Sequence, residues 1–67
     1  MSVARVTEII STSEKSFDDA VKDGIERASK TLDNITGAWV ADQEVTVKSG
    51  KIQSYRVRLK VTFILKN

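Results

Sequence analysis

Residues 52–65 of the chain, IQSYRVRLKVTFIL, largely determine its fold. From Tyr55 onwards every second residue is apolar, and mostly basic residues occupy the positions between them. Side chains along a β-strand point alternately to opposite faces of the sheet, so this pattern predicts a strand with one apolar and one basic face. The basic positions are Arg56, Arg58 and Lys60.

The segment before this strand predicts a β-hairpin. Residues 38–47 are rich in β-branched side chains, and residues 48–51, KSGK, separate them from the last strand. Two connections fit this spacing: a two-residue loop of Ser49 and Gly50, or a three-residue loop of Ser49, Gly50 and Lys51. In the three-residue alternative, Lys48 pairs with Ile52.

The charges on the two strands favour the longer loop. In that register Glu44 opposes Arg56 and Asp42 opposes Arg58, so opposite charges face each other across the hairpin. The shorter loop places Gln43 opposite Arg56, so that apolar and charged residues of the two strands would share one face of the hairpin. We therefore predict the three-residue loop, with its glycine in the left-handed conformation.

The first half of the chain predicts a strand followed by a helix. Residues 4–10 are rich in β-branched side chains, and the Ser-Thr-Ser sequence after them ends this pattern. Ser16 and Asp19 have the spacing of a capping box at a helix N-terminus. Apolar residues then recur at steps of three and four through Leu32, which predicts a helix that ends near Asn34.

The expected architecture is a single α+β domain, residues 1–67, with the order β-α-β-β. The helix should lie across the apolar face of a three-stranded antiparallel sheet. Gly24 lies in mid-helix, where glycine costs about 1 kcal/mol relative to alanine, so we expect a close approach to the sheet there. A strand over residues 52–65 would be about 46 Å long, whereas a compact chain of this size is about 28 Å across. This mismatch predicts oligomerisation.

The composition excludes most familiar catalytic chemistry. The chain has no Cys and no His, so it lacks thiolate nucleophiles, imidazole bases and the usual zinc ligands. Its formal charge of +2 is too small for a nucleic-acid footprint, and acidic residues neighbour the basic strand. No stretch approaches the roughly 20 apolar residues of a membrane span. We therefore expect a non-enzymatic cytoplasmic protein with neither a nucleic-acid nor a membrane partner.

Four segments of the chain together resemble a known family: VTEII at residues 6–10, SFDDAV at 16–21, ASKTL at 28–32 and YRVRLKVTF at 55–63. With these segments the chain resembles the dodecin family over almost its whole length. The resemblance implies a protomer whose three-stranded sheet wraps around one helix, and copies of that protomer that assemble into a hollow homododecamer.

The resemblance also implies a flavin site at subunit interfaces. In the best-known dodecins, a Trp that opens the second strand stacks on the flavin, and a Gln of the third strand hydrogen-bonds to it. In this chain the position of the Trp corresponds to Gly37, and the position of the Gln corresponds to Arg56. Trp39 lies two residues after Gly37, on the same side of an ideal strand, so its indole remains within reach of such a ligand. We predict sequestration and storage of riboflavin or FMN, with Trp39 stacking and Gln43 and Arg56 hydrogen-bonding.

An alternative is a flavin-free, calcium-binding dodecin. Residues 37–44 look similar to dodecins that lack the flavin residues, at least one of which is described as calcium-binding. Asp42 and Glu44 would then supply oxygen ligands, with other copies, carbonyls or water completing the six to eight that calcium takes. A third interpretation is that these carboxylates only form cross-strand ion pairs with Arg58 and Arg56.

Overall fold

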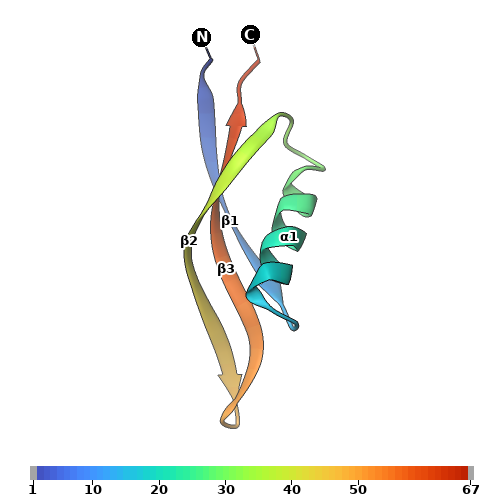
Figure 1. Ribbon diagram of the computed structural model, residues 1–67, viewed down its shortest axis with the longest axis vertical. Coiled ribbons are helices and arrows are strands. Elements are labelled where there is room, and N and C mark those ends of the chain that lie inside the picture. Colours follow the sequence, from blue (N-terminus) through green and yellow to red (C-terminus); the bar gives the residue numbers. More distant parts are fainter. Residues whose placement is uncertain (1, 67) are drawn as a thin grey trace.

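The computed structural model describes residues 2–66 and confirms the predicted element order. The elements are β1 (Ala4–Ser13), α1 (Phe17–Ala28), β2 (Ile35–Lys48) and β3 (Lys51–Ile64). β3 lies in the middle of an antiparallel sheet of order β1-β3-β2, and α1 lies along one side of this sheet (Figure 1). The protomer measures 51 × 19 × 14 Å, because the two hairpin strands extend well beyond the helix.

β1 is longer than predicted. The sequence pattern placed its end at Ile10, whereas the strand continues to Ser13, which pairs with Tyr55. The Ser13 hydroxyl is buried, donates to the Asp19 carboxylate at 2.7 Å and accepts from the Lys15 backbone N–H at 2.9 Å. Because these bonds satisfy the buried hydroxyl, a polar residue is tolerated at the end of the strand.

α1 begins where predicted but ends earlier than Asn34. The Ser16 hydroxyl caps the helix by accepting from the Asp19 backbone N–H at 2.9 Å. The helix ends at Ala28 and turns follow it; Asn34, with a φ of 63°, then leads into β2. Leu32 still packs against the core, which explains why the apolar periodicity continues past the last helical residue.

The core lies between α1 and the middle of β3. Val57, Leu59 and Val61 are fully buried there, and Ala20 of the helix is buried against them. β2 contributes no buried residue, so most of its side chains remain exposed in the protomer. The core is completed by partly buried apolar side chains, namely Ile9, Phe17, Val21, Ile25, Leu32 and Ile35.

Gly24 lies where α1 packs against the sheet, as predicted. A Cβ at this position would lie 2.9 Å from Leu59 Cδ1 and 3.0 Å from Ser11 Cβ. Alanine gains about 1 kcal/mol of helix propensity, but displacing packed neighbours typically costs about 1–3 kcal/mol. We expect Gly24→Ala to lower the free energy of unfolding by about 1 kcal/mol net, measured by denaturant titration. Gly37→Ala is the control, since a Cβ there meets nothing within 4 Å; a G24A midpoint at or above the wild-type value would contradict the close packing.

The hairpin loop is shorter than predicted. Lys48 pairs with Lys51, not with Ile52, so only Ser49 and Gly50 connect the strands. Both have positive φ, 53° and 76°, which is the geometry of a type I′ turn. The left-handed conformation of Gly50 is confirmed, whereas the three-residue loop is wrong.

A β-bulge reconciles this short turn with the predicted pairing. The register shifts between Thr46 and Val47, which leaves Gln53 of β3 without a partner. This extra residue offsets the missing loop residue. The predicted opposition of Glu44 and Arg56 is therefore confirmed.

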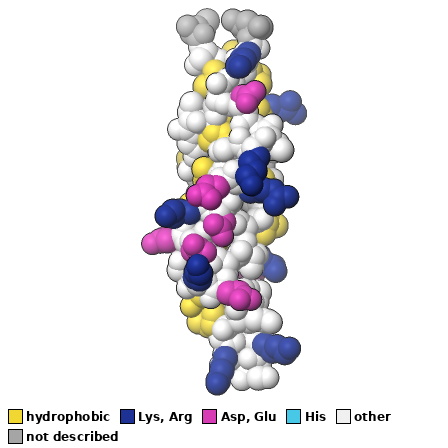
Figure 2. Space-filling view, turned by 90° about the vertical axis from the view of Figure 1, so that its right-hand side faces the viewer, with side chains coloured by type: hydrophobic (Ala, Val, Ile, Leu, Met, Phe, Trp, Pro, Cys, Tyr) yellow, Lys and Arg dark blue, Asp and Glu magenta, His cyan; other side chains and the backbone are white. Residues whose placement is uncertain are grey.

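The surface of α1 that faces away from the sheet is charged. Figure 2 shows acidic and basic side chains mixed over the helix side of the molecule. Asp18, Asp23 and Glu26 are exposed on α1. Within residues 2–66, no helix has the length and apolar character needed to span a membrane.

The protomer exposes more surface than a compact monomer of its mass. Its accessible area is 5182 Å², whereas a compact 7.4 kDa monomer exposes about 4,200 Å². Its radius of gyration is 13.8 Å, against about 11 Å for a compact chain of this length. Exposed apolar side chains contribute to the excess accessible area, among them Val6, Ile10, Trp39, Val40, Val47 and Ile52. Such an uncovered apolar surface is typical of a subunit that is completed by other copies.

Candidate functional site

All the candidate residues except Gln43 lie on the side of the sheet that faces away from α1, which we call the helix-free face. The core residues of β3 point toward α1, so the alternate residues Arg56, Arg58 and Lys60 point away from it. Directly opposed residues of neighbouring strands share a face, and the register therefore defines rows across all three strands. These rows are Gly37–Thr62–Val6, Trp39–Lys60–Glu8, Asp42–Arg58–Ile10 and Glu44–Arg56–Thr12.

Trp39 is a largely uncovered aromatic side chain on this face. It is 61% exposed, and Lys60 is its direct cross-strand neighbour. Gly37 lies on the same face, as predicted, and the space beside it is open, since a Cβ there would meet nothing within 4 Å. A large ring with this exposure offers an apolar surface for a planar ligand or another subunit.

The predicted cross-strand ion pairs are present in the next two rows. Arg56 Nη1 lies 3.2 Å from Glu44 Oε1, and Arg58 Nε lies 3.5 Å from Asp42 Oδ1. All four side chains are well exposed, and pairs of this kind contribute about 0.2–1 kcal/mol each. Together with Ile10 they line a cavity of about 90 Å³. These carboxylates partly neutralise the two arginines on this face.

The carboxylates of Asp42 and Glu44 do not form a calcium shell within one chain. Each is already paired with an arginine, whose positive charge opposes cation binding. Among residues 2–66, no three Asp, Glu, His or Cys side chains lie close enough together to hold a metal ion. Calcium takes six to eight oxygen ligands, so a site here requires oxygens from other copies or from water.

A β-bulge separates Gln43 from the other predicted flavin residues. The bulge is at Ala41 of β2, and beyond it Gln43 opposes Val57, which is buried against the helix side of the sheet. Gln43 therefore lies on the opposite face from Trp39 and Arg56. Within one protomer, the structure therefore does not bring Gln43 together with Trp39 and Arg56.

The same bulge brings Lys60, which was not among the predicted ligand-binding residues, beside Trp39. Without the bulge, the pairing of Glu44 with Arg56 would continue along β2 and place Trp39 opposite Val61, a core position. With the bulge, the indole turns to the helix-free face. Arg56 is four residues from Lys60 along β3, or about 13 Å, so Lys60 is the nearer cation.

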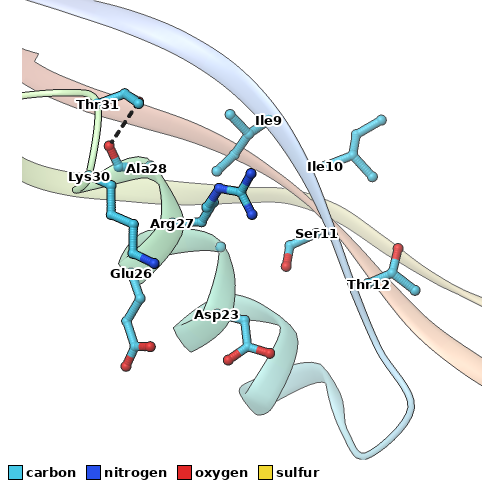
Figure 3. Close-up of a pocket in the computed structure, with 11 residues that line it drawn as sticks. Ile9, Ile10, Ser11, Thr12, Asp23, Glu26, Arg27, Ala28, Lys30 and Thr31 are labelled. Carbon is cyan, nitrogen blue, oxygen red and sulfur yellow. Dashed lines mark hydrogen bonds between the residues drawn. The ribbon is translucent and has the colours of Figure 1, made fainter.

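A larger groove lies between β1 and α1 and contains none of the predicted site residues (Figure 3). Its volume is about 660 Å³, and Ile9 and Ser11 of β1 line one side. From α1, the Arg27 side chain extends toward β1, while Asp23 lies further along the helix. The candidate ligand residues of β2 and β3 therefore belong to a separate surface.

The fold and the helix-free face define a class of protein, a small α+β ligand-binding subunit. One helix covers one side of its sheet, and the other side exposes an aromatic ring among charged rows. The chain matches the family described as Dodecin over residues 3–66. It belongs to the dodecin family of oligomeric small-ligand-binding proteins.

Named relatives agree with this assignment. The chain is 38% identical over 63 residues to the calcium dodecin of Mycobacterium tuberculosis, covering 94% of this chain and 89% of the relative. A crystal structure of that calcium dodecin, described as having a novel calcium-binding site, superposes with a TM-score of 0.83 at 38% identity, covering 96% of this chain and 91% of the other. The structure of the dodecin from Streptomyces davaonensis superposes with a TM-score of 0.93 at 36% identity, covering 98% of this chain and 97% of the other.

Proposed function

We propose that this chain binds and stores a flavin, riboflavin or FMN, at the subunit interfaces of a homododecamer, and that it is not an enzyme. The observation that carries the proposal is the 61% exposed Trp39 on the helix-free face. Its indole offers one side of a stacking site for a planar ring. The cytoplasmic location expected from the sequence stays a prediction.

The open surface of the protomer supports an interface site. Trp39 can cover only one side of a flavin ring, and the surrounding strand β2 is almost entirely exposed. A second copy that packs on this face would cover the other side of the ring and bury the apolar side chains around it. Gly37 leaves room beside the indole. Arg56 is paired with Glu44 two rows away from Trp39, so a hydrogen bond from Arg56 to the ligand would come from another subunit. Gln43 would reach the ligand only from another subunit.

A flavin titration tests this proposal. The assembled protein is stripped of bound ligand and added to riboflavin or FMN, and flavin fluorescence is recorded. We expect saturable quenching with micromolar or tighter affinity, because an indole stacked on an excited flavin transfers an electron to it rapidly. Unquenched fluorescence at saturating protein would contradict flavin storage.

The alternative is a flavin-free assembly that binds calcium through Asp42 and Glu44. The name of the Mycobacterium tuberculosis relative supports it, together with the position of both carboxylates on one exposed face. If this alternative holds, calcium should raise the melting temperature of the wild-type assembly, since a ligand that binds only the folded state stabilises it. Asp42→Asn combined with Glu44→Gln should abolish the shift, whereas Asp18→Asn on the far side of the sheet should keep it. An unchanged melting temperature at millimolar calcium would remove this alternative.

A further inference from the structure

Lys60 differs from the other basic residues of β3 on the helix-free face. Arg56 and Arg58 each have a carboxylate partner, at 3.2 and 3.5 Å. Lys60 is exposed, and within residues 2–66 no carboxylate lies within 4.0 Å of its ammonium group. Even Glu8, its cross-strand neighbour on β1, forms no ion pair with it. The charge of Lys60 is therefore available to a ligand.

Lys60 is also the cross-strand neighbour of Trp39. Directly opposed residues in an antiparallel pair have Cβ atoms about 4.5–5.5 Å apart, so the lysine stem begins beside the indole. A planar ligand stacked on Trp39 would have the ammonium group at its rim. There the ammonium can reach an acidic substituent of the ligand, and the long flexible stem allows it to follow that substituent.

We infer that Lys60 selects a flavin that carries a phosphate monoester over the uncharged flavin. This inference rests on the proposed function, since it requires a ring stacked on Trp39. The phosphate of FMN lies at the end of the ribityl chain that leaves the ring, and there it can accept a charge-assisted hydrogen bond from the ammonium group, whereas the ribityl chain of riboflavin ends in an uncharged hydroxyl. Neighbouring Arg58 contributes less, because its guanidinium is engaged by Asp42.

The test compares riboflavin and FMN on the assembled protein. The wild type should bind FMN roughly 10-fold more tightly than riboflavin. Lys60→Gln should lower FMN affinity to the riboflavin level and leave riboflavin affinity unchanged. Lys60→Arg should keep the preference for FMN. Added NaCl should weaken FMN binding and leave riboflavin binding unaffected, because an exposed charge pair is screened by salt.

Lys51→Gln is the matched control. It removes the same charge from the same strand, at the hairpin end nine residues away, and should leave both affinities unchanged. Equal wild-type affinities for FMN and riboflavin would overturn the selection by Lys60 but not flavin storage. If Lys60→Gln lowered the affinities for FMN and for riboflavin equally, the role of Lys60 would be merely structural, and its selection of FMN would also be overturned. If neither flavin binds the wild type, the proposed function fails and this inference fails with it.

Discussion

Leu59→Ala should prevent the isolated protomer from folding. Leu59 is fully buried at the centre of β3, beneath α1, and its truncation leaves a cavity. Such a change typically costs about 2–5 kcal/mol, and a core of this size supplies only about 3–5 kcal/mol in total. We expect loss of the far-ultraviolet circular dichroism signal at 25 °C, or a melting temperature that depends strongly on protein concentration if assembly rescues the fold.

Val47→Ala is the matched control for this variant. Val47 also lies in a β-strand, but it is 61% exposed near the hairpin end. Its truncation should leave the circular dichroism signal intact. A Leu59→Ala protein with wild-type melting behaviour would contradict the assignment of the core to the contact between α1 and β3.

Trp39→Ala should weaken flavin binding by roughly 10- to 100-fold, the range expected for removing one aromatic stacking partner. The fold of the protomer should survive, because the side chain is exposed and makes no contribution to the buried core. Trp39→Phe should retain part of the affinity, since it keeps an aromatic face. The measurement is the flavin-quenching titration, with the assembly state checked by size-exclusion chromatography.

Ile52→Ala provides the comparison for Trp39→Ala. Ile52 is 55% exposed on β3 near the hairpin end, far from Trp39 along the sheet. Its loss should leave flavin affinity unchanged. Flavin affinity that is unaffected by Trp39→Ala, in a protein of normal assembly, would contradict stacking on this indole.

The parts of the fold that depend on local chemistry could be predicted from the sequence. The N-cap at Ser16 was predictable because its hydroxyl bonds to a backbone group only three residues away. The pairing of Asp42 with Arg58 was predictable because alternation and charge agree on both strands. The end of α1 was not, since Leu32 packs against the core from outside the helix and extends the apolar periodicity.

The placement of the candidate site depended on β-bulges that the residue pattern did not reveal. Ala41, which lies between Val40 and Asp42, has no side-chain signal that distinguishes a bulged position from a regular one. Yet this single extra residue puts Trp39 on the helix-free face and Gln43 on the other. Lys60 could be recognised as the neighbour of Trp39 only once this register was known. Oligomerisation was foreseeable, because a strand as long as β3 exceeds the size of a compact globule of this mass.

The most direct test of the flavin site is a crystal structure of the assembled protein with FMN bound. We predict that the isoalloxazine ring stacks on the indole of Trp39 at about 3.5–4.0 Å, with a second subunit covering its other side. The phosphate should lie within hydrogen-bonding distance of the Lys60 ammonium group. A flavin bound in the groove between β1 and α1, or a helix-free face that holds calcium and no flavin, would contradict this account.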